Sequence, residues 1–259
     1  MMTFIKLEGL TKKFGGLTAV DEVDFEIEKG KITAIIGPNG AGKSTFFNLI
    51  SGFHQPTSGS ITFEGKDITK TPPHIVARLG IARTFQTTHL FDTSSVIDNI
   101  IVGYRLRTKS KLFDAILRTK REKREEKEAI ERAIEVLDFV GLTNLANSPV
   151  STISQESKKR VAIALALATG PKVIFLDEPA AGINPGETEG LAELMKKIVD
   201  SGITVCTIEH KMQMIMGLAD NIMVLNHGAK IAQGTPEEIK NNPTVIEAYL
   251  GGESSAEVI

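Results

Sequence analysis

The sequence predicts an α/β fold with a mixed sheet, and three observations support this. A glycine-rich loop at residues 37–45 lies between a short apolar run and a helix-like segment. Two further apolar runs, 172–178 and 203–208, end in polar residues, as buried parallel strands often do where their carboxyl ends form a site. Residues 3–8 and 21–28 instead alternate apolar and polar side chains, which is typical of half-exposed antiparallel strands.

The glycine-rich loop matches the P-loop pattern: a glycine, four free positions, then Gly-Lys-Ser/Thr. The run 31–36 before it is predicted to be a buried strand, and a helix is expected to begin at Ser44. Backbone N–H groups of residues 40–45 would cradle a β-phosphate at the start of this helix. Lys43 would reach the β- and γ-phosphates, and the Ser44 hydroxyl would bind Mg²⁺. The nucleotide-binding residues expected here are Gly37, Pro38, Asn39, Gly40, Ala41, Gly42, Lys43, Ser44 and Thr45.

Two residues outside the loop have more than one interpretation. Phe14, before a Gly-Gly turn, is either a platform on which a purine stacks or an ordinary core residue. Gln86 ends a predicted strand at 81–86, where it is either a structural hydrogen-bonding residue or a group that binds Mg²⁺ or orients a water. Between these two residues we expect the P-loop helix to Ile50, a turn-rich stretch at 52–59, a strand at 60–63, a turn at 65–67 and a helix at 72–79.

A helical subdomain is predicted at about residues 94–165, inserted in the nucleotide-binding core of one domain that spans 1–259. A mixed-charge run at 120–128 continues into apolar residues with helical spacing, which favours a solvated helix with i,i+4 ion pairs. A second helix at 154–169 is rich in Ala and Leu. The segment also contains an expected helix at 96–102 and a basic loop at 105–111.

The second half of the chain supplies acidic and imidazole groups at strand ends. The strand at 172–178 places Asp177 where it can hold Mg²⁺ through water, and Glu178 where it can act as general base on an attacking water. His210 follows the strand at 203–208 and is a candidate γ-phosphate contact, or an ordinary imidazole. The remaining elements are expected to be a helix at 184–200, a hairpin of 221–226 and 229–233 across His227-Gly228, and two short helices within 236–250.

Composition excludes several other classes of protein. The 259 residues are 41% hydrophobic and 24% charged with a formal net charge of −2, which gives no support for nucleic-acid binding. The one cysteine, Cys206, lies in an apolar run and is expected to be a buried thiol. We find no apolar run of about 18 residues and no signal peptide, so we expect a cytoplasmic protein. If it works at a membrane, a partner must hold it there.

With these residues in place, the chain resembles the ATP-binding cassette (ABC) ATPases, the motor subunits of ABC transporters, over residues 3–250. The resemblance rests on Phe14 as the adenine-stacking residue, the P-loop, Gln86 as the Q-loop, the Walker B segment 175–179 and His210 as the switch histidine. It implies ATP and Mg²⁺ as cofactors and a RecA-like core with an antiparallel β subdomain. The implied catalytic residues are Glu178, His210 and Gln86, Asp177 joins the ATP site, and Ser44, Gln86 and Asp177 would hold Mg²⁺.

More narrowly, segments 83–86, 180–185, 234–236 and 242–251 resemble the ATPases of branched-chain amino-acid importers. This resemblance implies a second ATPase subunit, transmembrane permease subunits and an extracytoplasmic solute-binding protein. It also implies a peripheral position on the cytoplasmic face of the plasma (inner) membrane. The alternative is an ABC-type ATPase of another system, such as lipid, urea or amide transport, assembly or repair.

One family motif differs. The signature Leu-Ser-Gly-Gly-Gln, which caps the γ-phosphate on a partner's P-loop, is replaced here by Ile153, Ser154, Gln155, Glu156 and Ser157. Glu156 would place a carboxylate near the triphosphate, unless it swings away or is neutralised by Lys158 or Lys159. Three interpretations remain: a heterodimer with one degenerate site, which we favour, an altered signature that lowers ATPase activity overall, or a harmless variant.

Overall fold

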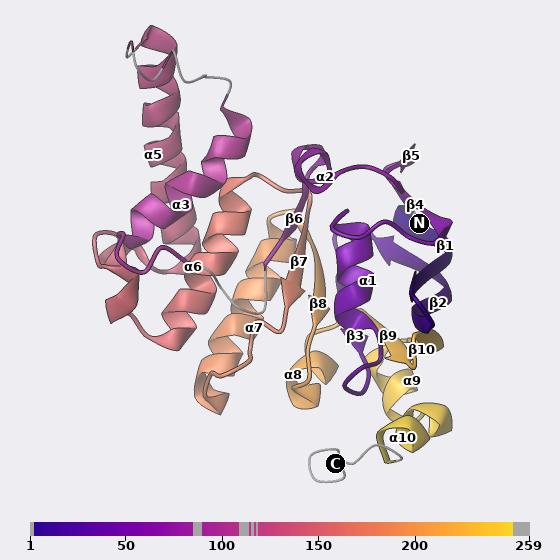
Figure 1. Ribbon diagram of the computed structural model, residues 1–259. Coiled ribbons are helices and arrows are strands. Elements are labelled where there is room, and N and C mark those ends of the chain that lie inside the picture. The colour runs from indigo at the N-terminus through magenta and orange to yellow at the C-terminus, as the bar shows by residue number, and fades with distance from the viewer. Residues whose placement is uncertain (1–2, 85–89, 109–113, 115–116, 118, 251–259) are drawn as a thin grey trace. The chain divides into compact units, whose positions relative to one another are not determined.

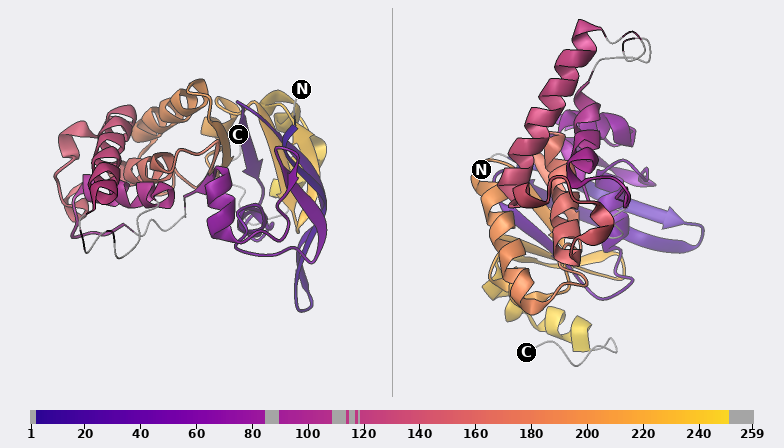
Figure 2. Two further views of the ribbon diagram at one scale, coloured as in Figure 1. Left: turned by 90° about the horizontal axis from the view of Figure 1, so that it is seen from above. Right: turned by 90° about the vertical axis from the view of Figure 1, so that its left-hand side faces the viewer.

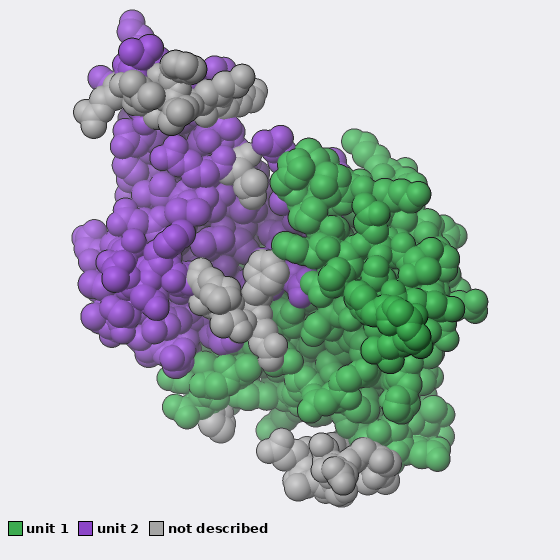
Figure 3. Space-filling model, viewed as in Figure 1, with its two compact units in different colours: residues 1–76, 175–259 green, residues 77–174 purple. Residues whose placement is uncertain are grey.

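The computed structural model describes residues 3–84, 90–108, 114, 117 and 119–250. The chain divides into two units, coloured separately in Figure 3: unit 1 contains residues 1–76 and 175–259, and unit 2 contains residues 77–174. Each unit is described by itself. Their limits differ from those of the predicted helical subdomain, because unit 2 begins earlier than residue 94 and ends later than residue 165.

An antiparallel sheet in unit 1 has the strand order β2-β1-β4-β5. Its first two strands are twelve residues long, much longer than the predicted 3–8 and 21–28. Pairing continues to the turn because β-bulges absorb the irregular alternation between Leu7 and Lys13. The predicted turn at 65–67 is partly wrong, since its last two residues pair with β4 as a short edge strand. The strands are β1 (Thr3–Phe14), β2 (Leu17–Glu28), β4 (Ser58–Phe63) and β5 (Lys66–Asp67).

The second sheet of unit 1 has the order β10-β9-β3-β8-β7 and confirms the predicted α/β fold. β3 pairs in parallel with both β8 and β9, and β10 returns antiparallel to β9. Every residue of β3, β7 and β8 is buried, which explains their continuous apolar sequences. The strands are β3 (Ile32–Ile36), β7 (Val173–Asp177), β8 (Thr204–Ile208), β9 (Asn221–Asn226) and β10 (Ala229–Gly234). The division between the units falls within β7.

Among the described residues, five helices lie wholly within unit 1 (Figure 1). Residues 184–187 form a capping box at the start of the predicted helix α7, with proline at the first helical position. The two short helices expected near the carboxyl terminus are present, and residues such as Ile239 and Val245 from them pack on Ile36 and Val224 of the sheet. The helices are α1 (Lys43–Ile50), α7 (Pro185–Asp200), α8 (Met212–Met216), α9 (Pro236–Lys240) and α10 (Pro243–Leu250).

Unit 2 is mainly helical, and its helices α3, α5 and α6 lie side by side (Figure 2). Of the apolar positions predicted from helical spacing, Ala129, Ala133, Leu137 and Val140 are buried in α5, whereas Ile134 is 49% exposed. The exposed face carries i,i+4 ion pairs such as Arg124 with Glu128, and exposed pairs of this kind stabilise a helix only slightly. The helices are α3 (Val96–Tyr104), α5 (Lys120–Val140), α6 (Gln155–Ala168) and the last residues of α2, which spans Pro73–Leu79. The strand β6 (Ile81–Arg83) pairs with β7. Short 3₁₀ turns lie at Arg105–Arg107, Thr143–Leu145 and Val150–Thr152.

Two further expectations from the sequence can be compared with the structure. Cys206 is completely buried in β8, and desolvation raises the pKa of its thiol, which confirms a buried, unreactive cysteine. Among the residues that the structure describes, no helix combines the length and apolar character needed to cross a bilayer.

Candidate functional site

The P-loop follows β3 and leads directly into α1. Two of its glycines are required by close packing: a Cβ at Gly37 would overlap the carbonyl oxygen of Leu225, and one at Gly42 would overlap that of Ala19. Gly42 also has a φ of 100°, a conformation that side chains disfavour. The loop therefore passes so close to the neighbouring backbone that only glycine fits at these two positions.

Lys43 is folded back onto the loop that contains it. Its Nζ donates hydrogen bonds to the carbonyl oxygens of Gly37 at 2.7 Å and Pro38 at 2.9 Å. Burial lowers the pKa of Lys43 below its ordinary value, while the carboxylates of Glu178 and Asp177 act in the opposite direction. A buried ammonium group next to two acids and a ring of amides is well placed to bind phosphate.

A cavity of about 460 Å³ opens beside the loop within unit 1. Phe14, the last residue of β1, lines it with 43% of the residue exposed; its ring is edge-to-face with His54 at 5.3 Å, and Nζ of Lys12 lies 4.9 Å from the ring centroid. An exposed aromatic face at a cavity mouth is suited to stacking on a purine. The cavity is also lined by Leu17, Thr18, Ala19, Asn39, Gly40, Ala41, Gly42, Lys43, Ser44, Thr45, Glu178, His210 and His227.

Glu178 and His210 both line this cavity. The Nε2 atom of His210 lies 3.2 Å from Oε1 of Glu178. Glu178 has a left-handed φ of 48°, unusual for a non-glycine residue, and its amide donates to the carbonyl oxygen of Ile208 at 2.9 Å. This hydrogen bond joins the end of β7 to the end of β8. A carboxylate held beside an imidazole is an arrangement that can accept a proton from a water molecule.

Glu209 supports this arrangement, and the sequence analysis gave it no role. Its side chain is 2% exposed and accepts backbone amides from Ala180 at 2.6 Å and from His210 at 3.0 Å. It thus fixes the loop after Glu178 to the strand end that carries His210. The sequence did contain a signal for this role, namely an acidic residue directly after a buried apolar run. A carboxylate buried there requires several hydrogen-bond donors, which neighbouring backbone amides can supply.

In unit 2, residues 154–157 form the first turn of α6. The Ser154 side chain caps the helix by accepting the amide of Ser157 at 3.1 Å. Glu156 forms an ion pair with Arg160, whose Nη1 donates to the carbonyl oxygen of Val140 at 3.1 Å. The partner of Glu156 is therefore Arg160, one helical turn later, rather than the expected Lys158 or Lys159.

The structure brings most of the predicted site residues together. Phe14, the P-loop, Glu178 and His210 line one cavity, and Asp177 is buried directly before Glu178 with 5% exposure. Gln86 lies outside the described residues. Gln155 belongs to unit 2 with the rest of the first turn of α6. The cavity thus combines an aromatic platform, an anion-binding loop with its lysine, and a carboxylate paired with an imidazole.

Comparisons with known proteins give a consistent result. A family model described as "ABC transporter" matches residues 20–181, and one described as "Branched-chain amino acid ATP-binding cassette transporter" matches residues 229–254. The chain is 42% identical to the high-affinity branched-chain amino acid transport ATP-binding protein BraF of Pseudomonas aeruginosa, over 95% of this chain and 97% of that protein. It is 37% identical to a probable branched-chain amino acid transport ATP-binding protein, LivG, of Archaeoglobus fulgidus, over 98% of each chain.

Solved structures have the same architecture. A nucleotide-free ATP-binding cassette from an ABC transporter is 36% identical with a TM-score of 0.86, over 97% of this chain and 100% of that one. The ADP conformation of an ATP-binding cassette is 34% identical with a TM-score of 0.86, over the same shares of the two chains. A dimeric cassette in a post-hydrolysis state, bound to ADP and Pi, is 25% identical with a TM-score of 0.75, over 90% of this chain and 98% of that one.

Proposed function

Because this chain belongs to the ABC transporter family of ATP-binding cassettes, we propose that it is the ATP-hydrolysing motor of an importer for branched-chain amino acids. Like the family, it binds and hydrolyses ATP, forms dimers and works with membrane permease subunits. The proposed substrate rests on the match of residues 229–254 to the family model of branched-chain amino acid ATP-binding cassette transporters.

The residues that line the cavity have different roles in this proposed function. Phe14 stacks on the adenine ring, and the amides of the P-loop bind the β-phosphate. Lys43 exchanges the carbonyl oxygens of Gly37 and Pro38 for phosphate oxygens when ATP enters. Glu178 accepts a proton from the attacking water while His210 holds the carboxylate in place and contacts the γ-phosphate.

A magnesium ion fits the remaining donors. The Ser44 hydroxyl at the start of α1 and the buried Asp177 carboxylate at the end of β7 are hard oxygen ligands of the kind that Mg²⁺ prefers. Gln86, which lies outside the described residues, supplies a further oxygen in this proposal. When bound, the ion neutralises charge on the β- and γ-phosphates. Asp177 and Ser44 hold it, and Glu178 remains available as the base.

The proposed assembly is a heterodimer of this chain with a second ATPase, placed on the cytoplasmic face of the inner membrane and served by an extracytoplasmic solute-binding protein. Support for the heterodimer comes from residues 154–157, which lack both glycines of the family signature. Arg160 pairs with Glu156 and offsets its charge, so the support rests on the two missing glycines, whose absence keeps the backbone from approaching the partner's γ-phosphate closely. The site formed by this chain's own P-loop depends on an intact signature from the partner.

Repair of the signature is expected to increase ATP hydrolysis. The variant Gln155→Gly, Glu156→Gly, Ser157→Gln restores close backbone approach and removes the carboxylate, so turnover of the assembled transporter should rise on the order of tenfold. Glu156→Gln is the matched control, because it removes the charge and keeps the side chain. Turnover and ATP-driven dimerisation that match the unmodified protein would contradict a damaged second site.

The transported solute is tested in proteoliposomes that hold the permease subunits, this chain and its partner ATPase. With ATP on the side of the cassettes, labelled leucine supplied with the binding protein should accumulate, and labelled urea should not. Omission of ATP is expected to reduce leucine uptake to background. Accumulation of urea, or ATP-driven uptake that excludes all branched-chain amino acids, would contradict the proposed substrate class while the ATPase assignment stands.

A further inference from the structure

The turn of the β9–β10 hairpin has an unusual sequence for its backbone. Its two central residues, His227 and Gly228, both have positive φ angles, 47° and 85°. This conformation suits a two-residue hairpin, in which Asn-Gly is the preferred pair. Histidine tolerates this conformation, and Glu64-Gly65 adopts a similar one elsewhere in the chain. The backbone therefore permits a histidine here and does not require one.

The turn is fastened to the P-loop rather than projecting freely. The amide of Gly228 donates to the carbonyl oxygen of Ala41 at 3.1 Å, and the amide of Asp21 donates to the carbonyl oxygen of Gly228 at 2.9 Å. Gly228 is buried against Ala19, which also packs on Gly42. His227 thus has a fixed place between the first residues of β2 and the P-loop.

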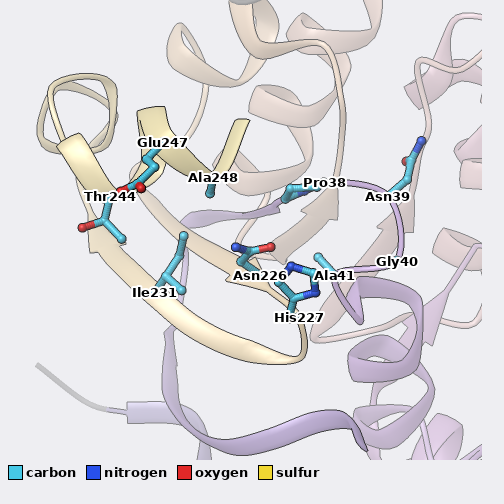
Figure 4. Close-up of a pocket in the computed structure, with 10 residues that line it drawn as sticks. All are labelled: Pro38, Asn39, Gly40, Ala41, Asn226, His227, Ile231, Thr244, Glu247 and Ala248. Carbon is cyan, nitrogen blue, oxygen red and sulfur yellow. The ribbon is translucent and has the colours of Figure 1, made fainter. Parts of the chain in front are cut away.

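The imidazole of His227 lies on the wall between two cavities. It is one of the residues that line the cavity of Phe14 and Lys43. It also lines a second cavity of about 450 Å³, shown in Figure 4, on the other side of the P-loop segment 38–41. The side chain is exposed, and it makes no hydrogen bond or ion pair with the residues that the structure describes.

We propose that His227, in its protonated form, contacts the phosphate chain of the bound nucleotide at its adenosine end. The proposal rests on the proposed nucleotide site and adds a residue to it. Phe14, which is proposed to hold the base, and the P-loop residues that are proposed to hold the β-phosphate line the same cavity as His227. The neighbouring Gly228 fastens the turn to this site, because its amide donates to Ala41 and its Cα packs against Ala19. An imidazolium at this place is a charge-assisted donor to a phosphate oxygen.

Several other charged groups face this region and decide how the experiment must be controlled. His210 is a second histidine of the nucleotide cavity, so a response of the unmodified protein to acidification combines the effects of two imidazoles. Only the difference between two variants isolates His227. The groups concerned are Asp21 on β2, Lys43 on α1, Glu178 after β7, His210 after β8 and Glu247, which faces the second cavity from α10.

The test compares the dissociation constant for ADP with Mg²⁺ at pH 6.0 and pH 8.0, by titration calorimetry. ADP avoids hydrolysis, and His227→Asn keeps the left-handed turn because asparagine adopts it readily. From pH 8.0 to pH 6.0, the ADP affinity of the unmodified protein should increase by a factor about five times larger than the factor for His227→Asn. This is the size expected of one exposed ionic contact. His210→Asn provides the matched background. The increase in ADP affinity of His210→Asn on acidification should exceed that of the double variant, which carries both His210→Asn and His227→Asn, by the same factor.

Two results would overturn the proposal. The first is an identical response to pH with and without the His227 imidazole, which leaves the nucleotide site intact and removes His227 from it. The second is a loss of affinity in His227→Asn that is equal at both pH values, which indicates a change in the turn rather than a charged contact. Failure of the unmodified protein to bind ADP at either pH would instead contradict the nucleotide site itself.

Discussion

Glu178→Gln is expected to bind ATP with nearly unchanged affinity and to hydrolyse it about 10²- to 10⁴-fold more slowly, which is the usual contribution of a positioned general base. The substitution keeps the size of the side chain and a polar group 3.2 Å from His210. It removes only the ability to accept a proton. Because the ATP-bound dimer would then persist, the variant should accumulate as a dimer in the presence of ATP.

The measurement is phosphate release by the assembled transporter, with nucleotide affinity determined separately. Glu193→Gln is a matched control, since Glu193 is an exposed acid of α7 that does not line the cavity. Phosphate release by Glu178→Gln at a rate close to that of the unmodified protein would refute the assignment of the base. It would also direct attention to His210 as the group that activates water.

Lys43→Ala is expected to weaken ATP binding at least about 100-fold, because it removes the buried ammonium group that binds the phosphates. The loss should be larger for ATP than for adenosine, since the base is held at Phe14. The substitution also removes the Lys43 hydrogen bonds to the carbonyl oxygens of Gly37 and Pro38, of which Pro38 keeps the amide of Ala41 as a donor, so folding must be checked by thermal unfolding.

Lys31→Ala serves as the control for Lys43→Ala. Lys31 is half-exposed directly before β3, and its Nζ lies 3.9 Å from a carboxylate oxygen of Glu28. The Lys31→Ala substitution should therefore leave the affinity for ATP unchanged. Direct binding of a fluorescent ATP analogue, measured by titration, separates the two variants. Equal affinities of Lys43→Ala and the unmodified protein would show that the nucleotide binds elsewhere.

Some features of this protein follow from local sequence, because their causes are local. The P-loop positions are consecutive, so strand, loop and helix could be predicted from one short stretch. The capping box at 184–187 and the buried face of α5 depend on residues within one or two turns of each other. The pair of Glu156 with Arg160 also obeys the i,i+4 rule, so the sequence contained the signal, although Lys158 and Lys159 had been expected instead.

Other features depend on residues that are distant in the chain. The β1–β2 hairpin is longer than its alternation predicts, because strand pairing and bulges extend it beyond the regular pattern. Glu209 acts through the amide of Ala180, 29 residues away, and no periodicity reports such a contact. The partners of a buried carboxylate are set by how two strand ends meet.

The sequence by itself determined the P-loop and the presence of a glutamate and a histidine after two buried strands. Only the tertiary structure decided where these groups lie around a common cavity, because adjacent strands of the sheet are far apart in the chain. It placed Glu178 against His210, folded Lys43 onto its own loop, and set His227 beside Ala41. The physical reason is that hydrogen bonds between strand ends and turns, such as that from Gly228 to Ala41, form only after the sheet has assembled.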